Sequence, residues 1–127
     1  MSAARLEHVN FTVADPDRTA RMLGDLFGWK VRWSGEAING GYTVHVGSDE
    51  TYLAIYSHAD PAAPADDSYE TRGGLNHIGI VVDDLDATEA QVKAHGYAPK
   101  NHADYEPGRR FYFDDENGVE YEVVSYA

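Results

Sequence analysis

Apolar and polar residues alternate in short runs along much of the chain, which is the pattern of strands that bury one face. Near the N-terminus, Val9, Phe11 and Val13 form an apolar side, whereas His8 lies on the polar side. A run in the second half repeats this arrangement, with His77 on its polar side. The pattern predicts two strands that each pack on a helix and turn a histidine away from it.

The two strands belong to an internal repeat. The segment LEHVNFTVADPDRT aligns with LNHIGIVVDDLDAT, 69 residues later. The matched pairs are Leu6 with Leu75, His8 with His77, Val9 with Ile78, Val13 with Val82, Asp15 with Asp84, Asp17 with Asp86 and Thr19 with Thr88. At an offset of 68 the closing strands also align, so that Ala54 matches Glu122. The chain is therefore two copies of one unit.

Each copy is expected to continue from its first strand into a helix and three further strands. Asp15 caps the first helix and Gly28 ends it, whereas Asp84 or Asp86 caps the second and Gly96 ends it. The expected strands after the helices are 29–35, 42–47 and 51–57 in the first copy, and 97–101, 109–115 and 119–126 in the second, where Asn117-Gly118 marks a hairpin.

These elements predict an α+β fold of two tandem βαβββ modules that form a cupped mixed sheet. The modules span about 5–58 and 74–126, and an Ala-, Pro- and Asp-rich connector of about 58–73 joins them. At 127 residues, the chain has the usual size of a single domain, residues 1–127.

Composition restricts the chemistry. The sequence has no cysteine, so any metal must be held by His, Asp, Glu or backbone oxygen. A formal net charge of −12 repels nucleic acid, and no apolar run is long enough for a membrane span or a secretory signal. We expect a cytoplasmic protein with a small-molecule partner and no nucleic-acid or membrane partner.

The repeat suggests a metal site on the polar faces of the sheets. Two modules related by a pseudo-twofold axis bring equivalent strands together, so that His8, His77 and Glu122 converge. Two imidazoles and one carboxylate form the facial triad that suits Fe(II), with Mn(II) or Zn(II) as alternatives. The ordinary interpretation of each residue alone is a packing histidine or an exposed edge-strand acid. The other candidates, His45, His58, His95 and His102, have no match in the repeat and are interpreted as surface or loop residues.

With its repeat, its paired histidines and its terminal Gly-x-x-x-Glu, the sequence resembles the vicinal oxygen chelate superfamily of glyoxalase I, bleomycin resistance proteins, fosfomycin resistance enzymes and extradiol dioxygenases. The resemblance runs from LEHVNFTV through LNHIGIVV to FYFDDENGVEYEVV. It implies that His8, His77 and Glu122 occupy three metal positions, for Fe(II) or Mn(II) first and Zn(II) or Ni(II) next. It also implies a homodimer.

Departures from the relatives shift the expected reaction. Ala54 stands where glyoxalase I carries a fourth, proton-transferring carboxylate ligand. Tyr112, Asp115, Gly118 and Glu122 resemble the extradiol dioxygenase signature, with Glu116 in place of the usual Pro. The resemblance therefore favours a dioxygenase-like enzyme acting on vicinal substrate oxygens.

In this enzyme Tyr112 is the expected hydrogen-bond donor, and His102 or His45 the expected base. Two alternatives remain. One is a lyase, isomerase or thiol transferase with the metal as Lewis acid, and the other is a non-enzymatic drug-binding protein.

Overall fold

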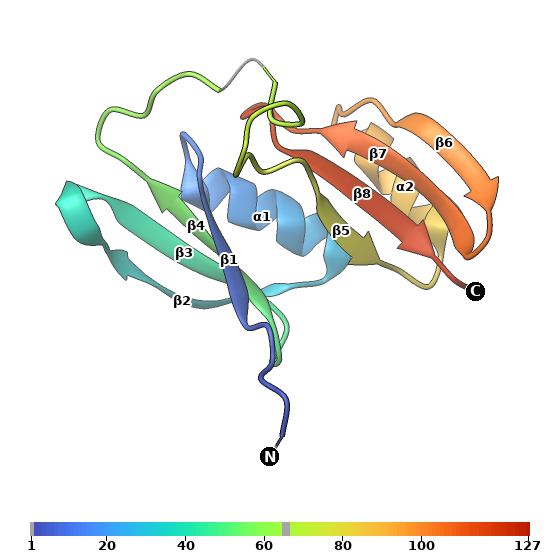
Figure 1. The fold of residues 1–127 in the computed structure, drawn as a ribbon, viewed down its shortest axis with the longest axis horizontal. Coiled ribbons are helices and arrows are strands. Elements are labelled where there is room, and N and C mark those ends of the chain that lie inside the picture. The colour runs from blue at the N-terminus through green and yellow to red at the C-terminus, as the bar shows by residue number, and fades with distance from the viewer. Residues whose placement is uncertain (1, 65–66) are drawn as a thin grey trace. The chain divides into compact units, whose positions relative to one another are not determined.

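The computed structural model describes residues 2–64 and 67–127, and the chain divides into two compact units, one ending at Ala62 and one starting at Ala63. The N-terminal unit holds β1 (His8–Thr12), α1 (Pro16–Phe27), β2 (Lys30–Glu36), a short 3-10 turn η1 (Ile38–Gly40), β3 (Tyr42–Gly47) and β4 (Tyr52–Ser57) (Figure 1). The C-terminal unit holds β5 (Ile78–Val81), α2 (Leu85–Ala94), β6 (Lys100–Tyr105), β7 (Gly108–Asp114) and β8 (Glu120–Ser125). The predicted α+β fold of two tandem βαβββ modules is confirmed.

Each unit contains one four-stranded mixed sheet with the same topology. The strand order is β1-β4-β3-β2 in the N-terminal sheet and β5-β8-β7-β6 in the C-terminal sheet. In both sheets the first strand pairs in parallel with the last, and the other neighbours are antiparallel. Each unit's first strand therefore lies beside its last strand.

The helix ends follow the predicted capping residues. The Asp15 carboxylate accepts a hydrogen bond from the backbone N–H of Arg18 at 3.2 Å, and Gly28 ends α1 in the left-handed region with φ 72°. In the second module Asp84, rather than Asp86, caps α2 by accepting from the N–H of Ala87 at 3.0 Å. The helix α2 ends at Ala94, two residues before Gly96, whose φ is 89°.

One face of each sheet packs on its helix and forms the core. In the N-terminal unit the buried side chains include Phe11, Val13, Leu23, Val44 and Ile55, and in the C-terminal unit they include Ile80, Val92, Phe111, Tyr121 and Val123. Every second residue of each strand consequently points to the opposite face. This alternation puts Glu120 and Glu122 of β8 on the face that the helix leaves uncovered.

The strand pairing agrees with the alignment of Ala54 and Glu122, and it adds a match between His45 and Tyr112 that the sequence alignment missed. Residue Leu53 pairs with Val9 and Tyr121 with Ile78, so Ala54 and Glu122 are structural equivalents. Opposite them, His45 pairs with Ala54 and Tyr112 pairs with Glu122. The interpretation of His45 as a residue with no match in the repeat was wrong, because β3 and β7 align at an offset of 67, not 69.

The expected strand at 97–101 is the one element whose bounds differ clearly from the prediction. Strand β6 begins at Lys100 and extends to Tyr105. Its pairing with β7 shifts by one residue between Lys100 and Ala103, and Asn101 there adopts a positive φ of 53°. A bulge of this kind interrupts the alternation on which the prediction relied.

Candidate functional site

Polar side chains gather on the uncovered sheet face of the C-terminal unit. His77 directly precedes β5, Tyr112 lies in β7 and Glu122 lies in β8. Tyr112 and Glu122 face each other across the antiparallel pair, and the ring of His77 meets that of Tyr112 edge-on with centroids 5.6 Å apart. The fold therefore brings together three of the predicted site residues.

The two carboxylate oxygens of Glu122 have different surroundings. Its Oε2 accepts hydrogen bonds from the Tyr112 hydroxyl at 2.6 Å and from the Arg110 guanidinium at 3.2 Å. Its Oε1 lies 3.6 Å from Nε2 of His77. One oxygen is thus held by donors, while the other faces an imidazole nitrogen.

Hydrogen bonding keeps this carboxylate ionised. Partial burial alone would raise the pKa of Glu122, but the hydrogen bonds from Tyr112 and Arg110, together with the charge of His77, lower it below its ordinary value. The same hydrogen bond, with burial, raises the pKa of Tyr112 to about 12. Tyr112 therefore stays protonated and acts as the donor to Glu122.

The other ring nitrogen of His77 has its own partner from the connector. The Tyr69 hydroxyl lies 3.0 Å from Nδ1 of His77 and donates a short hydrogen bond to Oε1 of Glu120. Glu120 is largely buried and also pairs with Lys100, at 3.2 Å. The imidazole is therefore contacted at both nitrogens, by Tyr69 on one side and by Glu122 on the other.

In the N-terminal unit His8 lies within a series of stacked rings. Its Nδ1 lies 2.9 Å from Oε1 of Glu7, and its ring stacks on Tyr52 with centroids 5.0 Å apart. The ring of His45 also stacks on Tyr52, with centroids 4.7 Å apart. It lies tilted against the ring of Trp33, with centroids 5.2 Å apart. The rings of His8, His45 and Tyr52 line a cavity of about 660 Å³ that Ala54 also lines.

Burial makes His45 a weaker base than an ordinary histidine. Desolvation lowers its pKa, and the neighbouring charges of His8 and Arg32 lower it further. The Arg32 guanidinium lies over the ring of Tyr52, 4.5 Å from its centroid. Position 54, where glyoxalase I was expected to carry a carboxylate, contributes only a buried methyl group.

His102 lies on the opposite, helix-covered face of the C-terminal sheet. Its Nε2 lies 3.0 Å from Oε2 of Glu89 in α2, and its ring stacks on the buried Phe111. The bulge in β6 is the reason, because one extra residue after Lys100 turns His102 away from the side shared by Lys100 and Tyr112. His102 is thus separated by the sheet from the group around Glu122.

Sequence reasoning missed four residues that support the site: Glu7, Tyr52, Tyr69 and Arg110. Arg110 carried a usable signal, since it is two residues from Tyr112 and shares its face. Tyr69 carried none, because it lies in a connector without periodicity.

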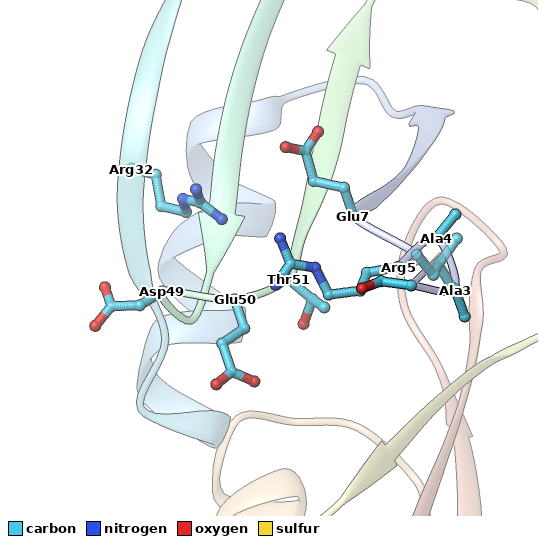
Figure 2. A pocket seen from close by; sticks show the side chains of 10 residues that line it. Ala3, Ala4, Arg5, Glu7, Arg32, Asp49, Glu50 and Thr51 are labelled. Carbon is cyan, nitrogen blue, oxygen red and sulfur yellow. The ribbon is translucent and has the colours of Figure 1, made fainter.

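A second cavity, of about 1030 Å³, lies beside the N-terminal segment (Figure 2). Figure 2 shows Arg5 and Arg32 extending their side chains into it, with Asp49 and Glu50 at its edge. None of the ten residues that line this cavity is a histidine. It therefore offers charged groups but none of the predicted metal ligands.

Residues 5–123 match the family model described as the Glyoxalase/Bleomycin resistance protein/Dioxygenase superfamily. The chain belongs to this superfamily. The resemblance inferred from the repeat and the paired histidines is confirmed.

Solved structures of the superfamily share the fold at low sequence identity. A glyoxylase/bleomycin resistance protein/dioxygenase domain from Frankia sp. EAN1pec is 23% identical with a TM-score of 0.81, over 98% of both chains. The fosfomycin resistance protein FosX from Mesorhizobium loti is 24% identical with a TM-score of 0.74, over 97% of this chain and 92% of its own. The antibiotic binding protein TnmS3 from Streptomyces sp. CB03234 is 17% identical with a TM-score of 0.74, over 100% of this chain and 99% of its own.

The superfamily therefore includes both enzymes and binding proteins among these neighbours. No curated protein matches the sequence. No helix in the described part of the chain has the length and apolar character needed to cross a membrane.

A divalent metal requires side-chain donors at a defined spacing. Within neither unit do the described residues form a ready cluster of three metal-binding side chains. His77 and Glu122 both lie in the C-terminal unit. Two ligands of one ion, each about 2.1 Å from it, lie roughly 3.0–3.4 Å apart at octahedral or tetrahedral angles. The 3.6 Å between Nε2 of His77 and Oε1 of Glu122 is close to this spacing, so the residues fit.

Proposed function

We propose that the protein is a metal-dependent, dioxygenase-like enzyme in which His8, His77 and Glu122 hold Fe(II) or Mn(II). The observation that carries the proposal is the pair formed by Nε2 of His77 and Oε1 of Glu122, 3.6 Å apart. This distance is too long for a hydrogen bond. The remaining polar atoms of both side chains already have partners, so this nitrogen and this oxygen are left for a cation.

The proposal treats residues 1–127 as one functional domain, because the ligands come from both modules. His8 matches His77 in the repeat, and its Nδ1 is likewise held by a neighbour, Oε1 of Glu7. Two imidazoles and one carboxylate leave several metal positions open, which suits a small substrate with vicinal oxygens. When bound, the metal would polarise those oxygens and provide a position for O2.

The chain's own residues prepare the carboxylate. Tyr112 and Arg110 donate to Oε2 of Glu122 and keep it charged, which leaves Oε1 as the ligand. The Tyr112 hydroxyl directs its proton to Glu122. The phenol oxygen of Tyr112 can therefore accept a hydrogen bond from a substrate hydroxyl. This part of the proposal gives His102 no role, since it lies on the helix-covered face.

Titration calorimetry with Mn²⁺ tests the site. The wild-type protein should bind about one ion per chain, and His8→Ala, His77→Ala and Glu122→Ala should each weaken binding at least tenfold. His102→Ala serves as the matched control and should bind as the wild type does. Circular dichroism of each variant establishes that it folds. Unchanged affinity in all three ligand variants would remove the basis of the proposal.

Oxygen uptake separates the dioxygenase from the Lewis-acid alternatives. With Fe(II) and a catechol-like substrate the enzyme should consume oxygen, measured with an oxygen electrode. Turnover of a hemithioacetal or an epoxide without oxygen uptake would favour the lyase, isomerase or thiol transferase. Ala54 argues against the glyoxalase I reaction, because the methyl group cannot transfer a proton.

The ring series of the N-terminal unit supports a second candidate, a non-enzymatic binding protein for flat aromatic molecules. His45 and Tyr52 line a cavity, the ring of Trp33 contacts that of His45, and the net charge of −12 would favour a cationic ligand. Quenching of Trp33 fluorescence by a planar aromatic cation tests it. Saturable quenching in the metal-free protein that Tyr52→Ala abolishes, without turnover, would favour binding over catalysis.

A further inference from the structure

The Tyr69 hydroxyl bridges His77 and Glu120 within the C-terminal unit. Its oxygen lies 3.0 Å from Nδ1 of His77 and makes a short hydrogen bond to Oε1 of Glu120. A direct contact between His77 and Glu120 is longer, at 3.8 Å. The bridging hydroxyl therefore makes the closer contact with the imidazole.

The number of protons in this bridge determines its direction. A phenol has one proton, and an ionised carboxylate can only accept, so the Tyr69 proton lies toward Glu120. The Tyr69 oxygen is then an acceptor, and Nδ1 of His77 must carry the proton that it receives.

A neutral imidazole with its proton on Nδ1 has its lone pair on Nε2. In this unit Nε2 is the nitrogen that faces Oε1 of Glu122. We propose that Tyr69 is a positioning residue that, held by Glu120, fixes His77 in the tautomer whose Nε2 lone pair is available beside Glu122. The role of Tyr69 in metal binding rests on the proposed function. The tautomer of His77 does not, because it is a property of the metal-free chain.

Lysine and aspartate side chains fix the far end of the bridge. Lys100 lies 3.2 Å from Oε2 of Glu120 and donates to Asp114 at 2.8 Å. Glu120 itself is only 14% exposed. The carboxylate that orients Tyr69 is therefore held from two directions, by the Tyr69 hydroxyl and by the Lys100 ammonium group.

The N-terminal unit has a comparable arrangement around the matched histidine. Oε1 of Glu7 accepts from the Tyr52 hydroxyl at 3.1 Å and lies 2.9 Å from Nδ1 of His8. Tyr52 and Glu120 occupy equivalent positions, because Tyr52 pairs with His8 and Glu120 precedes Tyr121, the partner of Ile78. Both histidines thus have Nδ1 beside a tyrosine–carboxylate pair. Such partners commonly orient metal-binding histidines.

Nitrogen-15 NMR of the metal-free protein at about pH 8, where an ordinary imidazole is neutral, reports the tautomer directly. The wild type should show His77 with Nδ1 protonated and Nε2 unprotonated. Tyr69→Phe should lose this preference, while Tyr42→Phe should keep it. Tyr42 is the matched control, because it donates to Asp17 at 3.1 Å in the other unit. A wild-type His77 protonated on Nε2, or an unchanged tautomer in Tyr69→Phe, would overturn the inference.

The affinity for Mn²⁺ provides the second measurement. Tyr69→Phe should bind Mn²⁺ about 10- to 100-fold more weakly than the wild type, and Tyr42→Phe should bind equally well. If the wild type binds no Mn²⁺ but Tyr69→Phe shifts the tautomer, the proposed function fails and the role of Tyr69 stands. If Mn²⁺ binds equally to the wild type and to Tyr69→Phe, the positioning role fails and the metal site stands. A Tyr69→Phe variant that does not fold leaves the wild-type tautomer as the deciding observation.

Discussion

The two oxygens of the Glu122 carboxylate differ because individual neighbouring residues engage them differently. Tyr112 and Arg110 engage one of its oxygens, and the other faces His77. The sequence predicted Glu122 and His77 from the repeat, because both lie at positions that the two modules share. Sequence reasoning could not identify Tyr69, since an isolated tyrosine in a connector has no periodic pattern to reveal its contact.

The lowered pKa of Glu122 predicts a pH dependence of stability. Because its folded-state pKa lies below its ordinary value, the charged carboxylate stabilises the folded protein above about pH 4.5, the ordinary value. This contribution is lost as the pH falls through the folded-state pKa. The difference in unfolding free energy between the wild type and Glu122→Gln, measured by urea denaturation, should therefore shrink as the pH is lowered from neutral. A difference that grows on acidification would contradict the assignment.

Tyr112 should act on metal affinity through Glu122. Tyr112→Phe removes the hydrogen bond of 2.6 Å, so the pKa of Glu122 should rise and protons should compete more strongly with the metal. We expect Tyr112→Phe to bind Mn²⁺ more weakly than the wild type, with a larger loss near pH 5 than at neutral pH, measured by calorimetry. The exposed Tyr126 offers a control, and Tyr126→Phe should have no effect. An equal loss at all pH values would show that Tyr112 does not act through the protonation of Glu122.

Individual elements were predicted well where alternation or capping was regular. The limits of α1 followed from Asp15 and Gly28, and β3 has the bounds expected from the sequence, 42–47. Strand β6 was poorly predicted because its bulge changes which side chains share a face. The same bulge places His102 beside Glu89 instead of near Glu122, which no regular alternation could indicate.

The hairpin between β7 and β8 depends on the buried Asp115. Its carboxylate accepts hydrogen bonds from the N–H groups of Asn117 and Val119 and from the Tyr121 hydroxyl. Asp115→Ala removes the carboxylate that these partly and fully buried donors share and should lower the unfolding free energy by about 2–4 kcal/mol. Asp115→Asn keeps an acceptor oxygen for the two N–H groups and should lose clearly less. Equal losses in urea denaturation would show that the hydrogen bonds are not the cause.

At the scale of the whole molecule, the repeat determines how many of the proposed metal ligands each unit carries. The N-terminal unit carries one predicted ligand and the C-terminal unit carries two. The repeat was visible in the sequence because equivalent residues kept their identity at His8 and His77. The match of His45 to Tyr112 was hidden, since the residue types differ and the offset changes along the module.

A metal that draws ligands from both units should link their stabilities. Both tryptophans, Trp29 and Trp33, lie in the N-terminal unit, so tryptophan fluorescence reports the unfolding of that unit alone. Mn²⁺ at about 100 times its dissociation constant should raise the fluorescence-detected unfolding temperature by about 8 °C. Glu122→Ala, a change in the C-terminal unit, should reduce this rise to about half or less at the same Mn²⁺ concentration, because it weakens binding at least tenfold. An undiminished rise in Glu122→Ala would contradict a shared site.

Pulsed electron paramagnetic resonance of bound Mn²⁺ tests the proposed His8, His77 and Glu122 site most directly, because it detects the nitrogen nuclei bound to the metal. The account predicts two histidine nitrogens in the wild type, one in His8→Ala and one in His77→Ala. The His102→Ala variant should retain both. A spectrum without nitrogen coupling, or one that neither His8→Ala nor His77→Ala alters, would contradict the account.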